Sequence, residues 1–334
     1  MSIDLIIKDI NKKYKRDIVV KGHDIPTREQ IPFTSPLMNY LTRGGIAENK
    51  MSELFGAEGS AKTTLALDLL KNFQLKYPDS YAVYLDAENT LDTEWGERLG
   101  VDFDKVIVIK PSDESGEMLL DMVLDCIRSG GVRFVIIDSV PFILPQMALE
   151  KQLDEKTYAG NSALMTTFCQ KVIPLLNQFK CTMICINQVR DKMGVTYTAY
   201  DTVGGHMLKH SYVQRFYLRK GKLLDADGRE QSNSFETPHG NLVNVKYEKN
   251  KITKNDRKAT YFTLKYETGI DVMTDTIELA IHLGVIRKAG AWLYYTVNDE
   301  ELKWNGKSAL ISDLTGNDEL FQLILTDTNT LAKE

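Results

Sequence analysis

The sequence predicts an α/β fold with a mostly parallel central sheet and an antiparallel extension. Two observations predict it. Between residues 51 and 187, short apolar runs alternate with helical patterns, which is typical of parallel strands joined by helices. From residue 212 onwards, strand-like runs follow one another without long helices, which favours antiparallel strands added to the same sheet. We therefore expect one sheet with helices on both faces.

The N-terminal segment predicts a short helix followed by a connection. Leu5, Ile6, Ile10 and Tyr14 fall on one side of a helical pattern whose other side carries lysines. One helix cannot fold alone, so we expect it to pack on the body or on a neighbouring subunit. The polar, proline-containing stretch 21–32 looks like the connection.

The later elements follow in order along the chain. The parallel strands are expected at 51–55, 81–87, 106–110, 134–138 and 181–187, with helices after Ala61, near 117–128 and around 162–179. The antiparallel strands are expected at 212–220, 241–248 and 259–267. From about residue 270, one good helix at 275–285 and an aromatic stretch at 291–295 predict a small α+β C-terminal domain.

Composition sets limits on the class of protein. With 43% hydrophobic and 26% charged residues, the chain has the composition of a globular protein. It has no apolar run of about 18 residues and no signal-peptide core at its start, so we expect a cytoplasmic protein without membrane contact. The cysteines lack metal-site spacing and are expected to be structural thiols, namely Cys126, Cys169, Cys181 and Cys185. Because the net charge is −5, any nucleic-acid contact must come from a local basic patch.

The motif GAEGSAKTT at residues 56–64 carries the clearest chemistry. It follows an apolar strand and opens a helical pattern, which is the context of a phosphate-binding P-loop. Small residues there let backbone N–H groups face phosphate oxygens at a helix N-terminus. Lys62 would reach the β- and γ-phosphates and the Thr63 hydroxyl would hold Mg²⁺, so ATP and Mg²⁺ are the expected cofactors. The alternative is a chance glycine-containing turn. The residues expected to bind nucleotide are Gly56, Ala57, Glu58, Gly59, Ser60, Ala61, Lys62, Thr63 and Thr64.

Ala61 stands where the motif usually has glycine. If this position needs a positive φ, its Cβ costs roughly 1–2 kcal/mol, whereas a helical φ costs nothing. The sequence therefore predicts nucleotide binding and leaves the rate of turnover open.

Three polar residues follow the apolar strands. Asp138 ends one strand and could hold the metal through water, and Glu88 could orient or deprotonate the attacking water. Gln188 could hydrogen-bond a γ-phosphate and release it after hydrolysis. Each residue alone could be a turn cap or a loop residue, but Glu88 and Asp138 together with the P-loop predict a hydrolysis site, whereas Gln188 could equally close a loop.

With these motifs, the chain resembles the bacterial RecA recombinase family from about residue 32 to residue 307. The resemblance rests on ordered matches at 86–102, 135–140, 186–195, 202–215, 249–252 and 284–295. It implies a RecA-like P-loop NTPase core at 32–269. It also implies an N-terminal oligomerisation helix with its linker at 1–31 and a small C-terminal domain at 270–334.

The resemblance also implies residue roles. Glu88 matches the glutamate that activates water, Asp138 the metal-site aspartate and Gln188 the γ-phosphate sensor. The positions that hold adenine correspond to Asp92 and Trp95, where Trp95 replaces a more usual tyrosine. The pair that reaches the neighbouring subunit's ATP corresponds to Lys249 and Lys251, although the sequence alone would favour a solvated basic face there.

Two DNA-contacting loops of the family correspond to residues 147–161 and 189–204. Cations for phosphates, interspersed Tyr197 and Tyr200, and glycine hinges make the second loop suitable for single strands. The expected DNA-binding residues are Arg190, Lys192, Gly204, Gly205, Lys209 and Arg215.

The chain departs from the family pattern in and beside these loops. The first loop is rich in acidic residues, and Leu164 stands where an arginine is common. His210 replaces a usual aromatic residue at a position linked to signalling between subunits. These departures bear on DNA affinity and cooperativity and not on the fold.

The resemblance thus implies a DNA-dependent ATPase and recombinase. It would form a homo-oligomeric helical filament on single-stranded DNA and exchange strands with double-stranded DNA. A ring-forming helicase motor would share the ATP site. A nucleotide-binding assembly protein, in which Ala61 has abolished turnover, is the other alternative.

Overall fold

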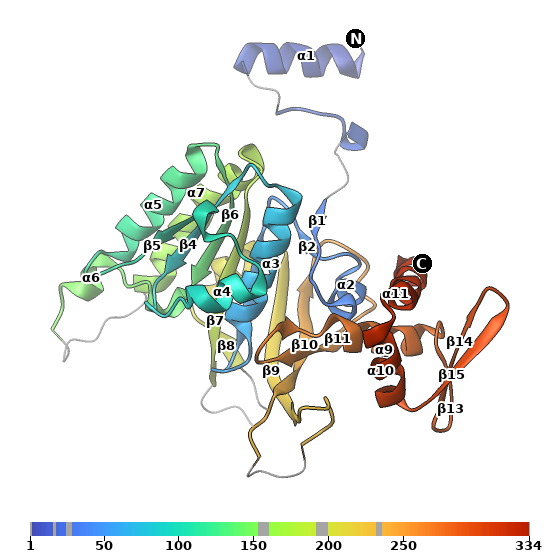
Figure 1. The fold of residues 1–334 in the computed structure, drawn as a ribbon. Helices are drawn as coiled ribbons and strands as arrows, with labels where there is room; N and C mark the ends of the chain where they lie inside the picture. The colour runs from blue at the N-terminus through green and yellow to red at the C-terminus, as the bar shows by residue number, and fades with distance from the viewer. Residues whose placement is uncertain are drawn as a thin grey trace.

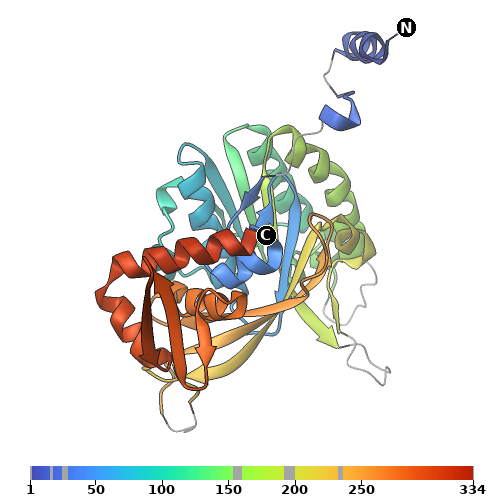
Figure 2. The same cartoon turned by 90° about the vertical axis from the view of Figure 1, so that its right-hand side faces the viewer.

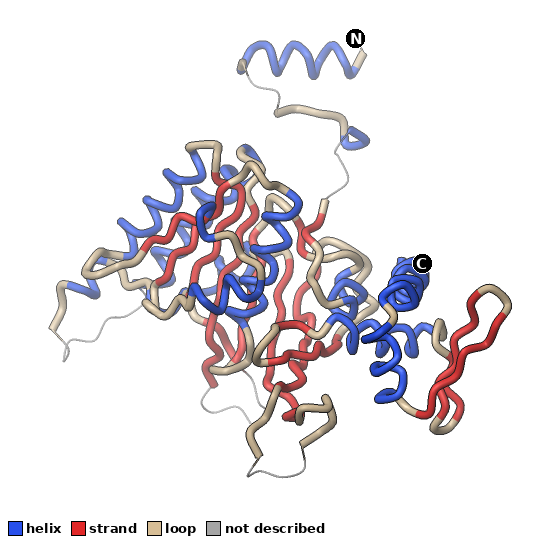
Figure 3. The backbone as a smooth tube through the Cα atoms, viewed as in Figure 1, coloured by secondary structure: helices blue, strands red, loops and turns tan. Residues whose placement is uncertain are grey.

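A computed structural model describes residues 2–15, 18–24, 29–152, 160–191, 200–231 and 236–333. A ten-stranded sheet forms its centre (Figures 1 and 3). The strand order is β12-β11-β10-β9-β3-β7-β6-β4-β5, and β8 pairs with β7 off this path. The strands are β3 (Met51–Gly56), β4 (Tyr81–Asp86), β5 (Val106–Ile109), β6 (Val132–Asp138), β7 (Thr182–Asp191), β8 (Tyr200–Thr202), β9 (Gln214–Leu224), β10 (Gly240–Asn250), β11 (Ala259–Lys265) and β12 (Gly269–Ile270).

The sheet is parallel in one half and antiparallel in the other. Strand β3 pairs in parallel with both β7 and β9, and β7, β6, β4 and β5 continue in the same direction. Strands β9, β10, β11 and β12 pair antiparallel. The predicted fold class is therefore confirmed.

Helices cover both faces of the sheet. In β6, Phe134 and Ile136 point into the core cluster beneath α3, while Val135 and Ile137 belong to the cluster beneath α5 and α7, as the two-residue period of a strand requires. One face carries α2 (Pro36–Thr42), α3 (Lys62–Lys76) and α4 (Thr93–Leu99). The other carries α5 (Gly116–Arg128), α7 (Gly160–Gln178) and α8 (Gly205–Ser211).

The N-terminal helix α1 (Ile3–Tyr14) buries none of its residues. It lies apart from the sheet in both views (Figures 1 and 2). Ser2 caps its first turn by accepting a hydrogen bond from the Leu5 N–H. Lysines occupy its last turn, where their positive charge interacts favourably with the helix dipole. The predicted helix is confirmed, and its packing on a neighbouring subunit stays a prediction. Downstream of it lies a small sheet of β1 (Gln30–Ile31) and β2 (Ile46–Ala47).

The C-terminal segment has its own sheet and its own core. Strands β13 (Arg287–Ala289), β14 (Trp292–Val297) and β15 (Glu300–Asn305) form an antiparallel sheet, packed with α9 (Val272–Leu283) in a cluster that includes Leu293. The expectation of a single helix here was wrong, because α10 (Lys307–Gly316) and α11 (Asp318–Lys333) also form. Their buried faces are narrow: α10 buries only Leu310 and Leu314, and α11 buries Leu320, Ile324 and the polar Thr328, one residue a turn.

Two further expectations concern cysteines and membranes. Cys181 and Cys185 are buried at the start and middle of the β7 region, as predicted. Within the described part of the chain, none of the helices combines the length and apolar character that crossing a membrane requires.

Candidate nucleotide site

The P-loop connects the end of β3 to the start of α3. Ser60 Oγ and Lys62 Nζ both donate to the carbonyl oxygen of Ala57, at 2.7 and 2.8 Å, so the loop closes on itself. At Gly56, a Cβ would collide with the carbonyl oxygen of Leu218, so the close approach of β9 requires glycine. The loop lines a pocket of about 680 Å³, large enough for a nucleotide.

The backbone of Ala61 has the positive φ that the sequence could not determine. Its φ is 66° and its ψ is 26°, in the left-handed region. The chain therefore carries the steric cost of a Cβ there, roughly 1–2 kcal/mol, at the residue before Lys62. The predicted loop nevertheless forms, with the Lys62 ammonium group at its centre.

The three predicted polar residues meet on the far side of this pocket. Strands β3, β7, β6 and β4 are parallel, so their carboxyl ends share one edge of the sheet, with Gly56 level with Gln188 and Asp86 level with Asp138. Glu88, Asp138 and Gln188 all line the pocket. Glu88 Oε1 accepts from Ser139 Oγ, and from Gln188 Nε2 at 3.4 Å. Gln188, the predicted γ-phosphate sensor, thus hydrogen-bonds Glu88, the carboxylate that would activate water.

Asp138 lies directly behind the first turn of α3. Its Oδ2 accepts from Thr63 Oγ1 at 2.9 Å and from the Tyr84 hydroxyl at 2.6 Å. Burial raises the pKa of Asp138, although both hydrogen bonds favour the ionised form, and burial lowers the pKa of Lys62. A cation bound beside the Asp138 carboxylate would stabilise its ionised form.

The donor atoms at this point fit Mg²⁺, which prefers oxygen ligands and keeps several waters. Among the described residues no cluster of three or more His, Cys, Asp and Glu side chains could form a metal cage. A metal here would depend on the Thr63 hydroxyl, the Asp138 carboxylate and oxygen atoms of a bound phosphate. This is the pattern of a nucleotide-linked Mg²⁺ and not of a structural metal.

The two residues expected near adenine lie on α4, beside the P-loop helix. Asp92 caps α4, since its Oδ1 accepts from the Trp95 N–H at 2.9 Å. Trp95 Nε1 donates to Thr64 Oγ1 at 3.3 Å, and the Arg98 guanidinium lies 5.1 Å from the Trp95 ring centre. The indole is therefore fixed next to the last P-loop residue, and its contact with adenine stays a prediction.

Lys249 is engaged within its own chain. Its Nζ donates to the carbonyl oxygens of Lys209 at 2.6 Å and His210 at 3.1 Å, in the last turn of α8. Burial, with Lys251 and Arg215 nearby, lowers the pKa of Lys249 to about 8. Lys251 follows the end of β10, and its N–H donates to the Val213 carbonyl at 2.9 Å. The predicted contact of both lysines with a neighbour's ATP involves a second chain and stays a prediction.

The residues expected at DNA begin where β7 leaves the sheet. Arg190 is exposed near the end of β7, and Lys192 lies outside the described residues. Gly204 precedes α8 and Gly205 begins it, with φ of 101° and 79°, and a Cβ on Gly204 would collide with Leu208. Of the first predicted loop, Asp154 and Glu155 lie outside the described residues.

Two of the expected DNA cations are paired inside the chain. Lys209 forms an ion pair with Asp201. Arg215 Nε lies 2.5 Å from Glu53 Oε2, and its NH2 donates to Thr202 Oγ1 at 3.1 Å. The Arg215 side chain is 17% exposed, and its ion pair with Glu53 joins β9 to β3. A contact of either residue with DNA stays a prediction.

Comparison with known proteins assigns the family. The family model described as RecA N-terminal domain matches residues 1–271. The chain belongs to the RecA family. It is 30% identical to protein RecA of Mycoplasma mobile over 334 residues, which cover 98% of this chain and 96% of that protein. It is 30% identical to protein RecA of Chloroherpeton thalassium over 326 residues, with 96% and 87% covered, and 33% identical to protein RecA of Chlorobaculum tepidum over 298 residues, with 88% and 82% covered.

Sequence analysis missed three residues that this RecA-family chain places at the site. Tyr84 donates to Asp138, Ser139 donates to Glu88, and the half-exposed Phe142 lines the nucleotide pocket. A signal for Tyr84 existed, because it lies two residues before Asp86 and so shares its strand face. Asp86 itself accepts from the N–H groups of Thr90 and Leu91 at 3.0 and 3.1 Å, which fixes the turn that carries Glu88.

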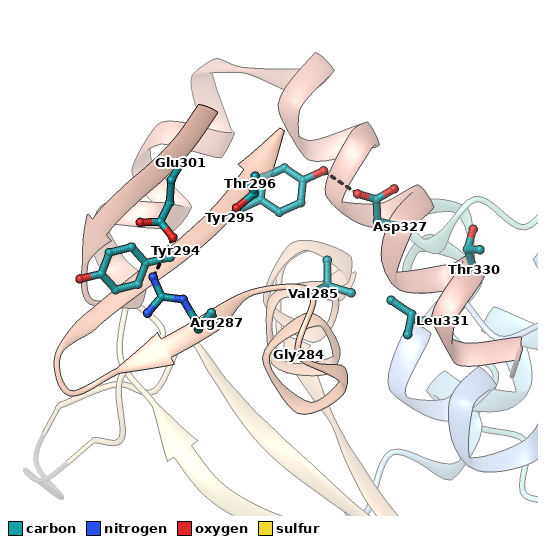
Figure 4. Close-up of a pocket in the computed structure, with 10 residues that line it drawn as sticks. All are labelled: Gly284, Val285, Arg287, Tyr294, Tyr295, Thr296, Glu301, Asp327, Thr330 and Leu331. Carbon is teal, nitrogen blue, oxygen red and sulfur yellow. Dashed lines mark hydrogen bonds and ion pairs between the residues drawn. The ribbon is translucent and has the colours of Figure 1, made fainter. Parts of the chain in front are cut away.

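A second pocket, of about 450 Å³, lies in the C-terminal segment (Figure 4). Tyr295 on β14 points to Asp327 on α11, with 2.7 Å between the hydroxyl and Oδ2. Arg287 pairs with Glu301 at 2.7 Å. The charged side chains drawn there, Arg287, Glu301 and Asp327, thus each have a partner within the pocket, and the P-loop pocket is the better candidate for a nucleotide.

Proposed function

We propose that this RecA-family chain is an ATP-dependent DNA recombinase of the cytoplasm. It hydrolyses ATP in response to DNA, forms helical filaments on single-stranded DNA, and pairs and exchanges strands with homologous double-stranded DNA. One observation carries the proposal: the P-loop, Asp138, Glu88 and Gln188 meet in one pocket, and β7 leads from Gln188 directly to the segment expected at DNA.

Different residues of the pocket bind the phosphates, hold the metal and activate the water. ATP with Mg²⁺, when bound, supplies the phosphoanhydride bond and neutralises part of the phosphate charge. The P-loop N–H groups and Lys62 hold the phosphates, while Thr63 and Asp138 hold the metal. Glu88 orients the attacking water and accepts its proton, and Ser139 holds the Glu88 carboxylate through Oε1.

Gln188 couples the pocket to DNA. Its amide donates to Glu88, and a γ-phosphate offers the same amide a charged acceptor. Arg190 lies two residues further along β7, so a change at Gln188 reaches the second loop through one strand. Lys249 and Lys251 of an adjacent subunit would stabilise charge at the γ-phosphate. Head-to-tail packing of α1 on the next subunit would extend the filament.

Hydrolysis is tested with Glu88→Gln, which keeps the shape of the side chain and removes the base. DNA-stimulated ATP hydrolysis should fall by at least about 100-fold, while nucleotide binding is retained. Hydrolysis is measured as phosphate release with and without single-stranded DNA. Equal background rates for the original chain and the variant would favour an assembly protein without turnover.

Assembly is tested by electron microscopy with single-stranded DNA and a non-hydrolysable ATP analogue. The recombinase proposal requires open helical filaments whose length follows that of the DNA. Closed rings would instead favour a helicase motor and would end the recombinase proposal.

A further inference from the structure

Tyr84 connects the hydrophobic core to the metal site. It lies in the middle of β4 and is 1% exposed, and its ring packs in the cluster that also contains Leu65 of α3 and Phe134 of β6. Its hydroxyl donates to Asp138 Oδ2 at 2.6 Å, across from β4 to β6. A phenol at neutral pH is protonated, so the hydrogen bond runs from Tyr84 to the carboxylate.

Tyr84 and Thr63 converge on the same oxygen atom. Among the described residues, Oδ2 takes both hydrogen bonds made to the Asp138 side chain. One donor comes from α3 and the other from β4, so the carboxylate is held from two elements. Two fixed donors on one oxygen restrict rotation of the carboxylate about its Cβ–Cγ bond.

We propose that Tyr84 is a positioning residue for the metal site: its hydroxyl orients the Asp138 carboxylate toward the Mg²⁺ of a bound nucleotide. This inference rests on the proposed nucleotide-dependent function. Tyr84 touches neither nucleotide nor metal, and it acts through Asp138, as outer partners of metal ligands commonly do.

A purely structural role predicts something different. A buried hydroxyl needs a partner, and Tyr84 could use Asp138 only to satisfy its own O–H group. Removal of the hydroxyl would then change folding stability and would affect nucleotide binding equally with and without metal. A positioning role changes only the part of the binding that depends on Mg²⁺.

The test compares ADP binding in Mg²⁺ and in EDTA, measured with a fluorescent ADP derivative. Tyr84→Phe keeps the packed ring and removes the hydroxyl. We expect its ADP affinity in Mg²⁺ to fall roughly tenfold, the usual effect of losing an outer partner of a metal ligand, while the affinity in EDTA is unchanged. In an Asp138→Asn background, Tyr84→Phe should have no further effect on binding in Mg²⁺.

Tyr212→Phe is the matched control. Tyr212 is fully buried, its hydroxyl faces the Cys185 thiol, and it is not among the residues that line the nucleotide pocket. Its loss should leave ADP binding unchanged in both solutions. The inference is overturned if Tyr84→Phe binds as the original chain does in Mg²⁺, or if it loses equal affinity in EDTA. If the original chain binds no ADP in either solution, the proposed function fails as well, so the two failures are distinguishable.

Discussion

Replacement of Ala61 by glycine tests the strained backbone of the P-loop. Ala61 has a φ of 66°, a conformation that glycine adopts freely and that costs other residues roughly 1–2 kcal/mol. Ala61→Gly relieves this cost in the folded state. It also raises the conformational entropy of the unfolded chain, which lowers the unfolding free energy by about 0.4–1 kcal/mol. Its methyl group packs against the core under α3, and losing that contact costs up to about 0.8 kcal/mol.

Ala57→Gly isolates the strain from the other effects. Ala57 lies in the same loop, is exposed, and is not among the described residues with positive φ. Glycine there brings only the unfolded-state cost, which cancels when the two variants are compared. The unfolding free energy of Ala61→Gly should therefore exceed that of Ala57→Gly by about 1 kcal/mol, after subtraction of the lost methyl contact.

Urea unfolding without nucleotide measures this difference. Equal unfolding free energies for the two variants would refute the left-handed conformation at Ala61. The loop already has the conformation that glycine would take, so ATP turnover of Ala61→Gly should stay within about tenfold of the original. A larger gain in turnover would show that alanine at this position suppresses catalysis.

Two further predictions concern DNA and pH. Arg190→Ala combined with Lys192→Ala should weaken single-strand binding and reduce the slope of log affinity against log salt by about 1.4. Fluorescence anisotropy over a salt series measures it, and an unchanged slope would remove both residues from the DNA site. Burial raises the pKa of Asp275 to about 7, although Ser35 and Thr263 donate to it. The neutral form is thus favoured in the folded chain, so stability should fall as pH rises from about 4 to 7, by up to about 4 kcal/mol. Asp275→Asn should flatten this dependence in urea unfolding, and equal slopes would exclude Asp275 as its source.

Much of the sheet could be predicted because its inner strands are continuous apolar runs. The expected strand 81–87 is β4 (Tyr81–Asp86), and 134–138 lies within β6 (Val132–Asp138). Strand β7 is longer than expected, since its polar end leaves β3 and pairs with β8 instead. Helices α2, α4 and α8 have seven residues each, fewer than two full turns, so their apolar period is too short to recognise.

The site residues were predictable where a motif fixes the position and unpredictable where register decides. The P-loop follows β3, Asp138 ends β6 and Gln188 lies in the last part of β7, and these ends must meet in a parallel sheet. The bond from Tyr84 to Asp138 depends on the alignment of β4 with β6, which the sequence does not encode locally. The basic character of Arg215 favoured a DNA contact, but its partner Glu53 is 162 positions earlier in the chain.

The buried Glu53 links the strand before the P-loop to β7 and β8, the strands on either side of the segment 192–199 in the chain. Glu53 lies on β3, three residues before the P-loop begins, and receives hydrogen bonds from Arg215 and Asn187. Asn187 also donates to the Val203 carbonyl, and Arg215 to Thr202, so both strands that flank the segment are tied to one carboxylate. Burial raises the pKa of Glu53, although Arg215 and Asn187 oppose this shift. The end of β7, β8 and β9 are therefore linked through one buried carboxylate to β3, the strand that leads into the P-loop.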